Sequence, residues 1–234
     1  MTDHANGNVR LRAKPEAGHR LTTPRAAAVA GIVFAVLLTG TFILLRSSVP
    51  EDPQDSGDWI AGNADRVNFA LWLVPFAGIA FLWFIGVIRD RLGDMEDRFF
   101  ASVLFGSGLL YLAMTFISTA IVGGLIAAYE VNPDLTIDGG VYTFAREVVT
   151  RVSNIFGVRM SAVFMISTAT IWYRSGSMPR WVVILTYLVA LVQLVTITLS
   201  LWLAILFPLW VLVVSLHFLI RSSGHHVEPA AAPL

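Results

Sequence analysis

The sequence predicts an all-α integral membrane protein with six transmembrane helices. Hydrophobic residues make up 56% of the 234 residues and charged residues only 14%, whereas globular chains average about 25% charged residues. Mean hydropathy is +0.71. The apolar residues also gather in runs of about 20 or more, the length that an α-helix needs to cross the hydrocarbon core. Because lipid offers no hydrogen-bond partner to the backbone, each run is expected to be helical.

The first apolar run, residues 26–45, follows a polar segment that is expected to be a disordered cytoplasmic tail, residues 1–24. Arg25 stands directly before the run, so a signal peptide and a membrane anchor are both possible. The run is longer than the apolar part of a signal peptide, and no small-residue cleavage site follows it. The sequence therefore predicts a retained helix that opens a transmembrane domain, residues 25–221.

Five more spans are predicted from the remaining apolar runs. The run from 181 to 220 has no Asp, Glu, Lys or Arg and is about twice the length of one span. We expect it to form two helices with a tight hairpin near residues 201–208, with Pro208 in the first turn of the second helix. A second polar tail is expected at 222–234. The predicted spans after the first are 67–88, 99–128, 148–173, 181–201 and 203–220.

The distribution of positive residues predicts the orientation. With six spans and a cytoplasmic N-terminus, eleven Lys and Arg fall in cytoplasmic segments, while Arg46, Arg66, Arg146 and Arg151 fall near the opposite surface. Positive residues favour the cytoplasmic side, so both termini are expected there. The eleven residues are Arg10, Arg12, Lys14, Arg20, Arg25, Arg89, Arg91, Arg98, Arg174, Arg180 and Arg221.

Several function classes are disfavoured by composition and motifs. The chain has no cysteine, which excludes disulfides, thiolate nucleophiles and iron–sulfur clusters. Lys+Arg and Asp+Glu balance at 16 each, which predicts no nucleic-acid partner. The sequence has no Gly-rich phosphate loop, no plausible Ser-His-Asp arrangement and no HExxH zinc motif. We therefore expect a protein that is not an enzyme and that has no metal or cofactor.

Arg159 lies deep inside the predicted span 148–173, where a charge costs a few kcal/mol on insertion scales. One interpretation is a structural arginine whose side chain extends toward the outer surface. The other is a contact to a lipid, a ligand, a helix-end carbonyl or a carboxylate. The other apolar runs contain no acidic residue, so a carboxylate partner must come from an outer helix end, such as Glu130 or Asp65.

The same span carries a polar face that does not include Arg159. At 100° per residue the face contains seven residues, and a polar face on a membrane helix is expected to face the bundle or water. Glu147 and Arg151 are spaced to form an i,i+4 ion pair. The candidate ligand or lipid contacts are Arg159, Arg151, Glu147, Asn154 and Glu130. The polar face comprises Glu147, Thr150, Arg151, Asn154, Gly157, Ser161 and Thr168.

Two ladders of mostly small residues at i,i+4 spacing predict close helix packing. Such ladders let helix backbones approach each other in membranes. Packing within the six-helix bundle is the favoured interpretation, and a seam between two copies of the chain is the alternative. One ladder is Ser107, Tyr111, Thr115, Thr119 and Gly123, and the other is Ala27, Gly31 and Ala35.

Four segments of the chain carry a resemblance: FLWFIGVIRDRLG at 81–93, EDRFFAS at 96–102, RMSAVFMIST at 159–168 and MPRW at 178–181. In these segments the chain resembles a family of small membrane proteins common in actinobacteria, mycobacteria included, for which no activity is established. The resemblance covers most of the chain from the first helix onward. It implies a multi-pass protein of the bacterial plasma membrane, and it assigns no catalytic or binding residue.

Two functions remain open at this point. The sequence favours a non-enzymatic scaffold or accessory subunit in the lipid bilayer, packed against another membrane protein or a second copy of itself. The alternative is a small transporter or a lipid- or ligand-binding protein that uses Arg159 and the outer end of the fourth helix.

Overall fold

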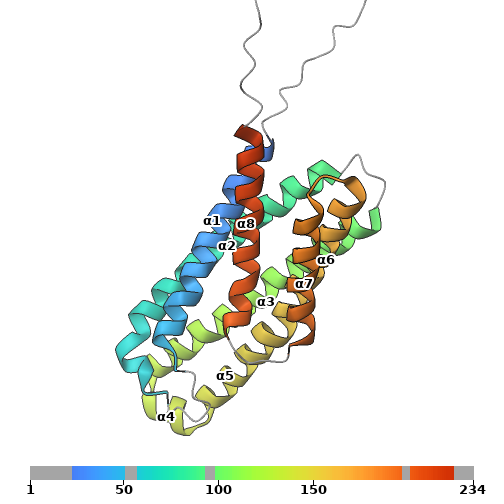
Figure 1. Ribbon diagram of the computed structural model, residues 1–234. Helices are drawn as coiled ribbons and strands as arrows, with labels where there is room; N and C mark the ends of the chain where they lie inside the picture. Colours follow the sequence, from blue (N-terminus) through green and yellow to red (C-terminus); the bar gives the residue numbers. More distant parts are fainter. Residues whose placement is uncertain (1–22, 51–56, 93–97, 197–200, 224–234) are drawn as a thin grey trace, which may run out of the picture.

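The computed structural model describes residues 23–50, 57–92, 98–196 and 201–223 (Figure 1). Within these ranges the chain is helical and contains no strand, so the all-α prediction is confirmed there. The predicted tails lie outside the described residues except for their innermost positions. Five helical segments are long and apolar enough to cross a membrane. They are α1 (Thr23–Ser48), α2 (Trp59–Leu92), α3 (Arg98–Val131), the segment from Val141 to Ser175, and α8 (Leu201–Ser223).

The fifth predicted span, residues 181–201, corresponds to a shorter helix, α7 (Arg180–Val195). Its 16 residues extend about 24 Å at the α-helical rise, against about 30 Å of hydrocarbon core. The predicted end of this span at residue 201 is wrong, because Thr196 already has an extended backbone (φ −75°, ψ 118°). Threonine is a weak helix former, and an uncharged run gives no other sign of where a helix ends.

The predicted position of Pro208 in the hairpin is also wrong. It lies inside α8, which begins at Leu201, rather than in the first turn. Pro75 likewise lies inside α2. Neighbouring helices and local adjustment make proline tolerable inside membrane helices, so a proline in an apolar run is a poor marker of a helix start.

The fourth long segment consists of three consecutive helical parts. It comprises α5 (Val141–Thr150), the π-helical segment η1 (Arg151–Gly157) and α6 (Val158–Ser175). The short helix α4 (Pro133–Asp138) precedes it, and the Asn132 side chain caps α4 by accepting a hydrogen bond from the Leu135 N–H at 3.0 Å. π-Helical turns are rare and often occur at functional sites. This one also changes which residues share a face along the segment.

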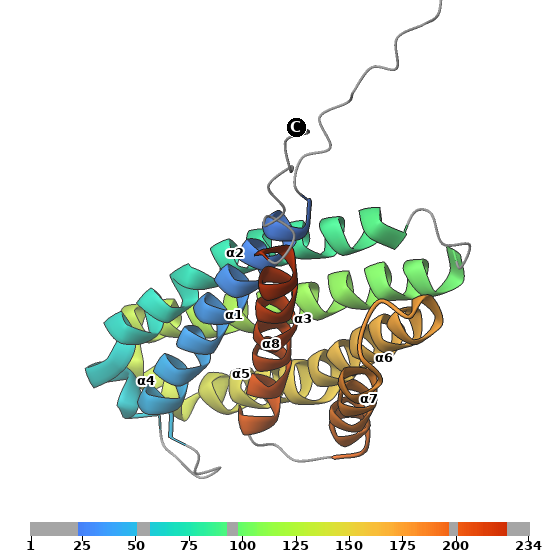
Figure 2. The same ribbon diagram turned by 45° about the horizontal axis from the view of Figure 1, so that its top comes forward.

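Figures 1 and 2 show α1 beside α8, with the start of α1 and the end of α8 at the same end of the bundle. The ladder on α1 forms this contact. Ala27 and Ala35 are buried, and a Cβ at Gly31 would overlap the Ser215 hydroxyl and lie 2.8 Å from the Phe84 ring. The α1 ladder is therefore covered by the chain's own helices, as the intramolecular interpretation expects.

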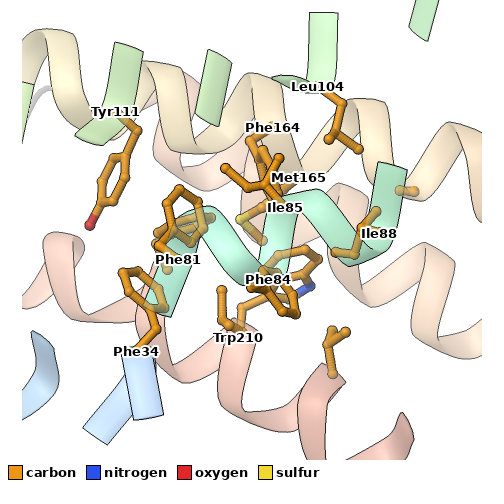
Figure 3. Packing of buried hydrophobic residues seen from close by; sticks show 14 of the residues in the cluster. Phe34, Phe81, Phe84, Ile85, Ile88, Leu104, Tyr111, Phe164, Met165 and Trp210 are labelled. Atoms are coloured by element: carbon orange, nitrogen blue, oxygen red, sulfur yellow. The ribbon is translucent and has the colours of Figure 1, made fainter. Parts of the chain in front are cut away.

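Two clusters of buried side chains hold the helices together. The larger one is rich in aromatic rings, and Figure 3 shows several of them meeting at its centre. The rings of Phe34 and Phe81 stack at 4.5 Å, and Phe207 meets Phe164 edge to face at 5.7 Å. The smaller cluster joins α2, α3 and α5 through Ile60, Val67, Leu125, Ile126, Tyr142 and Ala145.

Candidate functional site: a cavity inside the bundle

A cavity of about 540 Å³ opens between α1, α2, α3, the α5–η1–α6 segment and the start of α8. Its volume falls in the range of about 300–1,000 Å³ that is usual for ligand sites. Protein interiors are otherwise packed with few voids larger than a water molecule. The cavity is therefore large enough to be a binding site rather than a packing defect.

The α3 wall of the cavity runs from Tyr111 to Leu125, which is about 21 Å along the helix axis. Two hydroxyls on this wall are bonded to their own helix. Thr115 donates to the Tyr111 carbonyl at 2.9 Å, and Thr119 donates to the Thr115 carbonyl at 3.0 Å. Hydroxyl groups bonded in this way already have hydrogen-bond partners within their own helix. These two side chains therefore do not need a polar ligand as a partner.

The π-helical segment forms the opposite wall with Ser153, Asn154 and Gly157. The Ser153 hydroxyl donates to the Ser118 hydroxyl at 2.8 Å, which joins η1 to α3 across the cavity. Thr150, which precedes η1 in the chain, and Ser161, which follows it, also line the cavity. Four of the seven residues of the predicted polar face, Thr150, Asn154, Gly157 and Ser161, therefore line one interior space.

Two arginines lie at the end of the cavity nearest to α4. Arg46 comes from the last turn of α1 and Arg146 from α5. The Arg146 Nη2 donates to the Pro50 carbonyl at 3.5 Å, while its Nη1 is enclosed and makes no hydrogen bond to the described residues. No Asp or Glu lines the cavity in the part of the chain that the structure describes. The charged side chains of the described lining are therefore both arginines.

Aromatic side chains line both ends of the cavity. Near the arginines, the Trp59 indole N–H donates to the Tyr142 hydroxyl at 3.1 Å. Far from them, Tyr111 is 6% exposed. Its hydroxyl lies near Thr115 and makes no hydrogen bond to a described residue. Tyr111 thus leaves an unused hydroxyl at this end of the cavity.

Gln193 of α7 ties two cavity-forming helices together. Its side chain is fully buried. It accepts a hydrogen bond from the Ser161 hydroxyl at 3.2 Å and donates to the Leu203 carbonyl at 3.3 Å. Ser161 and Ala204, the residue after Leu203, both line the cavity. Gln193 therefore fixes the position of α6 against the start of α8.

Arg159 does not line the cavity. It is half-buried, and its Nη1 donates to the Ile155 carbonyl at 2.8 Å, one turn toward the N-terminal end of its own helix. No described carboxylate lies within 4 Å of its guanidinium. The side chain therefore lies along its own helix, the direction in which helical side chains lean.

The other predicted contacts do not gather around Arg159. Glu147 and Arg151 form the predicted ion pair at 3.4 Å, but both side chains are exposed to 60% or more. Glu130 is exposed near the end of α3. Only Asn154 of the candidate set lines the cavity.

The α3 ladder has two roles in the structure. Ser107 is buried and donates to the Val103 carbonyl at 2.7 Å, and a Cβ at Gly123 would lie 3.6 Å from Leu71. Tyr111, Thr115 and Thr119, in contrast, line the cavity. Three of the five residues of the predicted packing ladder are therefore cavity wall.

Sequence reasoning missed both cavity arginines, because each was counted only as a flanking charge. A signal for Arg146 was present in the spacing. Arg146, Thr150, Ser153, Gly157 and Ser161 follow one another at intervals of three or four residues, which places them on one helical face.

Comparison of the chain with protein-family models, with curated proteins and with solved structures finds no match.

Proposed function

We propose that this protein is a six-span protein of the bacterial plasma membrane that binds a lipid or another amphiphilic ligand in the cavity. The observation that carries the proposal is the cavity itself, which joins two arginines at one end to a long wall of apolar and self-bonded side chains. An amphiphile has the same division between a polar head and an apolar tail.

The membrane setting is supported by the outer surface of the bundle. Large apolar side chains point outward from every long helix, among them Ile43, Trp72, Trp83, Ile117 and Val213. Soluble monomers rarely expose large contiguous apolar surfaces, whereas lipid tails solvate such surfaces well. The aromatic residues of the sequence thus serve both the core and the lipid contact.

Six spans are supported by the direction of α7. Figure 1 shows α7 leading the chain from the end of α6 toward the level at which α8 begins. The start of α1 and the end of α8 share one end of the bundle, as an even number of crossings requires. The excess of positive residues at that end favours a cytoplasmic location for both termini. The cavity arginines then lie on the outer side.

The test compares a variant that places a large side chain in the cavity with one that places the same side chain on the outer surface of α3. Thr119 lines the cavity, whereas Ala120, the next residue on α3, is exposed. Thr119→Trp and Ala120→Trp are each extracted gently and weighed by native mass spectrometry. We expect the wild type and Ala120→Trp to retain an amphiphile of defined mass, and Thr119→Trp to lose it. Equal retention by all three proteins, or none by the wild type, would refute the proposal.

A further inference from the structure

We propose that the ligand carries an anionic head group, a phosphate or a carboxylate, and that Arg146 and Arg46 hold it at the α1–α5 end of the cavity. This inference rests on the proposed function. It commits to an amphiphile whose charge lies between these arginines and whose tail extends along α3.

The first support is the state of Arg146. A guanidinium carries five N–H donors in a planar fork. In Arg146 one long hydrogen bond of 3.5 Å reaches the Pro50 carbonyl, and the enclosed Nη1 has no partner among the described residues. Buried donors are nearly always paired in folded proteins. An anion at this position would satisfy Nη1 and accept the bidentate bonds that arginine forms with phosphate and carboxylate.

The second support is the arrangement of charge around Arg146. Arg46 lines the same cavity from α1, and Pro50, which contacts Arg146, lies four residues after Arg46. Asp and Glu are absent from the described cavity lining. An anion placed between the two guanidinium groups would attract both of them. A neutral or cationic head group would gain no such attraction.

The third support is the lining beyond the arginines. Apolar side chains such as Leu71, Val122 and Val158 alternate there with hydroxyl-bearing residues, and the Thr115 and Thr119 hydroxyls are bonded within α3. No other Lys or Arg lines the described cavity. A small free anion would fill only the arginine end, whereas an anionic lipid would fill both. The shape and chemistry therefore favour an anionic group attached to an apolar chain.

The experiment measures lipid binding to the purified full-length protein by native mass spectrometry. Phosphatidylglycerol and phosphatidylcholine with identical acyl chains serve as probes. The variants are Arg146→Gln and Arg46→Gln, with Arg66→Gln as control because Arg66 is exposed on α2 and does not line the cavity. We expect the wild type and Arg66→Gln to prefer phosphatidylglycerol by about tenfold, the scale of one buried charged hydrogen bond. Each cavity variant should lose most of this preference while remaining monodisperse.

The outcomes separate this inference from the proposed function. If the wild type binds both lipids equally and Thr119→Trp abolishes both, the cavity is a lipid site but the anionic head group is refuted. If neither lipid binds, the proposed function fails as well. Displacement of the lipid by inorganic phosphate or glycerol phosphate would assign the arginines to a soluble anion and refute the amphiphile. A preference that survives in both Arg146→Gln and Arg46→Gln would show that the arginines do not provide it.

Discussion

The aromatic core and the cavity are built on the same helices, yet one is filled and the other is open. Along α3 and α6, Leu104 and Phe164 are buried in the aromatic core, while Thr119 and Ser161 line the cavity. The core is packed by rings that meet at 4.5–6.3 Å. The difference lies in the size of the side chains, because the cavity wall uses hydroxyl, glycine and valine residues where the core uses phenylalanine.

This contrast fits the proposed function, in which the core provides rigidity and the cavity binds the ligand. A void forfeits the dispersion contacts that its lining would otherwise make. The chain compensates on the core side with tight packing, and joins the cavity walls with hydrogen bonds such as Ser153 to Ser118. Mutations in the two regions should therefore affect different properties, stability in the core and ligand retention in the cavity.

The largest expected effect on stability is the loss of a core ring. Phe207 is fully buried among other aromatic rings, so Phe207→Ala should cost about 3–5 kcal/mol. Phe42 is half-buried at the cavity wall, so Phe42→Ala should cost less than half as much. Unfolding by sodium dodecyl sulfate, followed by circular dichroism, measures both. Equal costs would show that the cavity region is as tightly packed as the core.

The next largest effect should come from the closest backbone approach. Gly31→Val places methyl groups against Ser215 and Phe84, whereas a Cβ at Gly40 on the same helix meets nothing within 4 Å. Gly31→Val should cost about 1–3 kcal/mol, the usual scale of overpacking, and Gly40→Val much less. The same unfolding assay tests this. If Gly40→Val proves as damaging as Gly31→Val, α1 does not pack against α8 as described.

A smaller effect is expected at the hydrogen bonds that link α7 to the cavity walls. Gln193→Leu removes the bonds to Ser161 and Leu203. Interhelical hydrogen bonds in membranes contribute about 0.6 kcal/mol on average and up to about 1.7 kcal/mol, so we expect a loss on this scale. A double-mutant cycle with Ser161→Ala provides the control. Strict additivity of the two changes would argue against a direct bond between the side chains.

The smallest effect is expected at the exposed ion pair of Glu147 and Arg151. Both side chains are mostly exposed and lie 3.4 Å apart. Exposed pairs contribute at most about 0.5 kcal/mol at i,i+4 spacing, so Glu147→Gln should leave stability and lipid retention almost unchanged. Unfolding and native mass spectrometry on the same preparation check both. Loss of the retained amphiphile in Glu147→Gln would move the binding site outside the cavity.

Much of the fold could be predicted because membrane spans depend on length and composition. Helices long and apolar enough to cross a membrane lie where the first four spans and the last span were predicted from apolar runs. The end of α7 at Val195 and the π-helical turns of η1 were not, since neither has a marker in an uncharged or mixed run. Both features depend on packing between helices that are distant in sequence.

The candidate site was predicted less well, because a single charge drew attention to Arg159. The Ile155 carbonyl accepts a hydrogen bond from its guanidinium, and the side chain lies outside the cavity lining. The cavity arises where the small residues of several helices face one another, and no single helix reveals that arrangement. The ladder on α3 indicated packing when taken alone, while its partners across the cavity make part of it a wall.

The most direct test of the account is an experimental structure of the wild-type protein in nanodiscs made with the lipids of its own membrane. We predict elongated density in the cavity, with its head group within hydrogen-bonding distance of the Arg146 guanidinium and its tail along α3 toward Tyr111. A cavity that is closed by side chains, or that holds only water while lipid surrounds the outer surface, would contradict the central claim that this space binds an amphiphile.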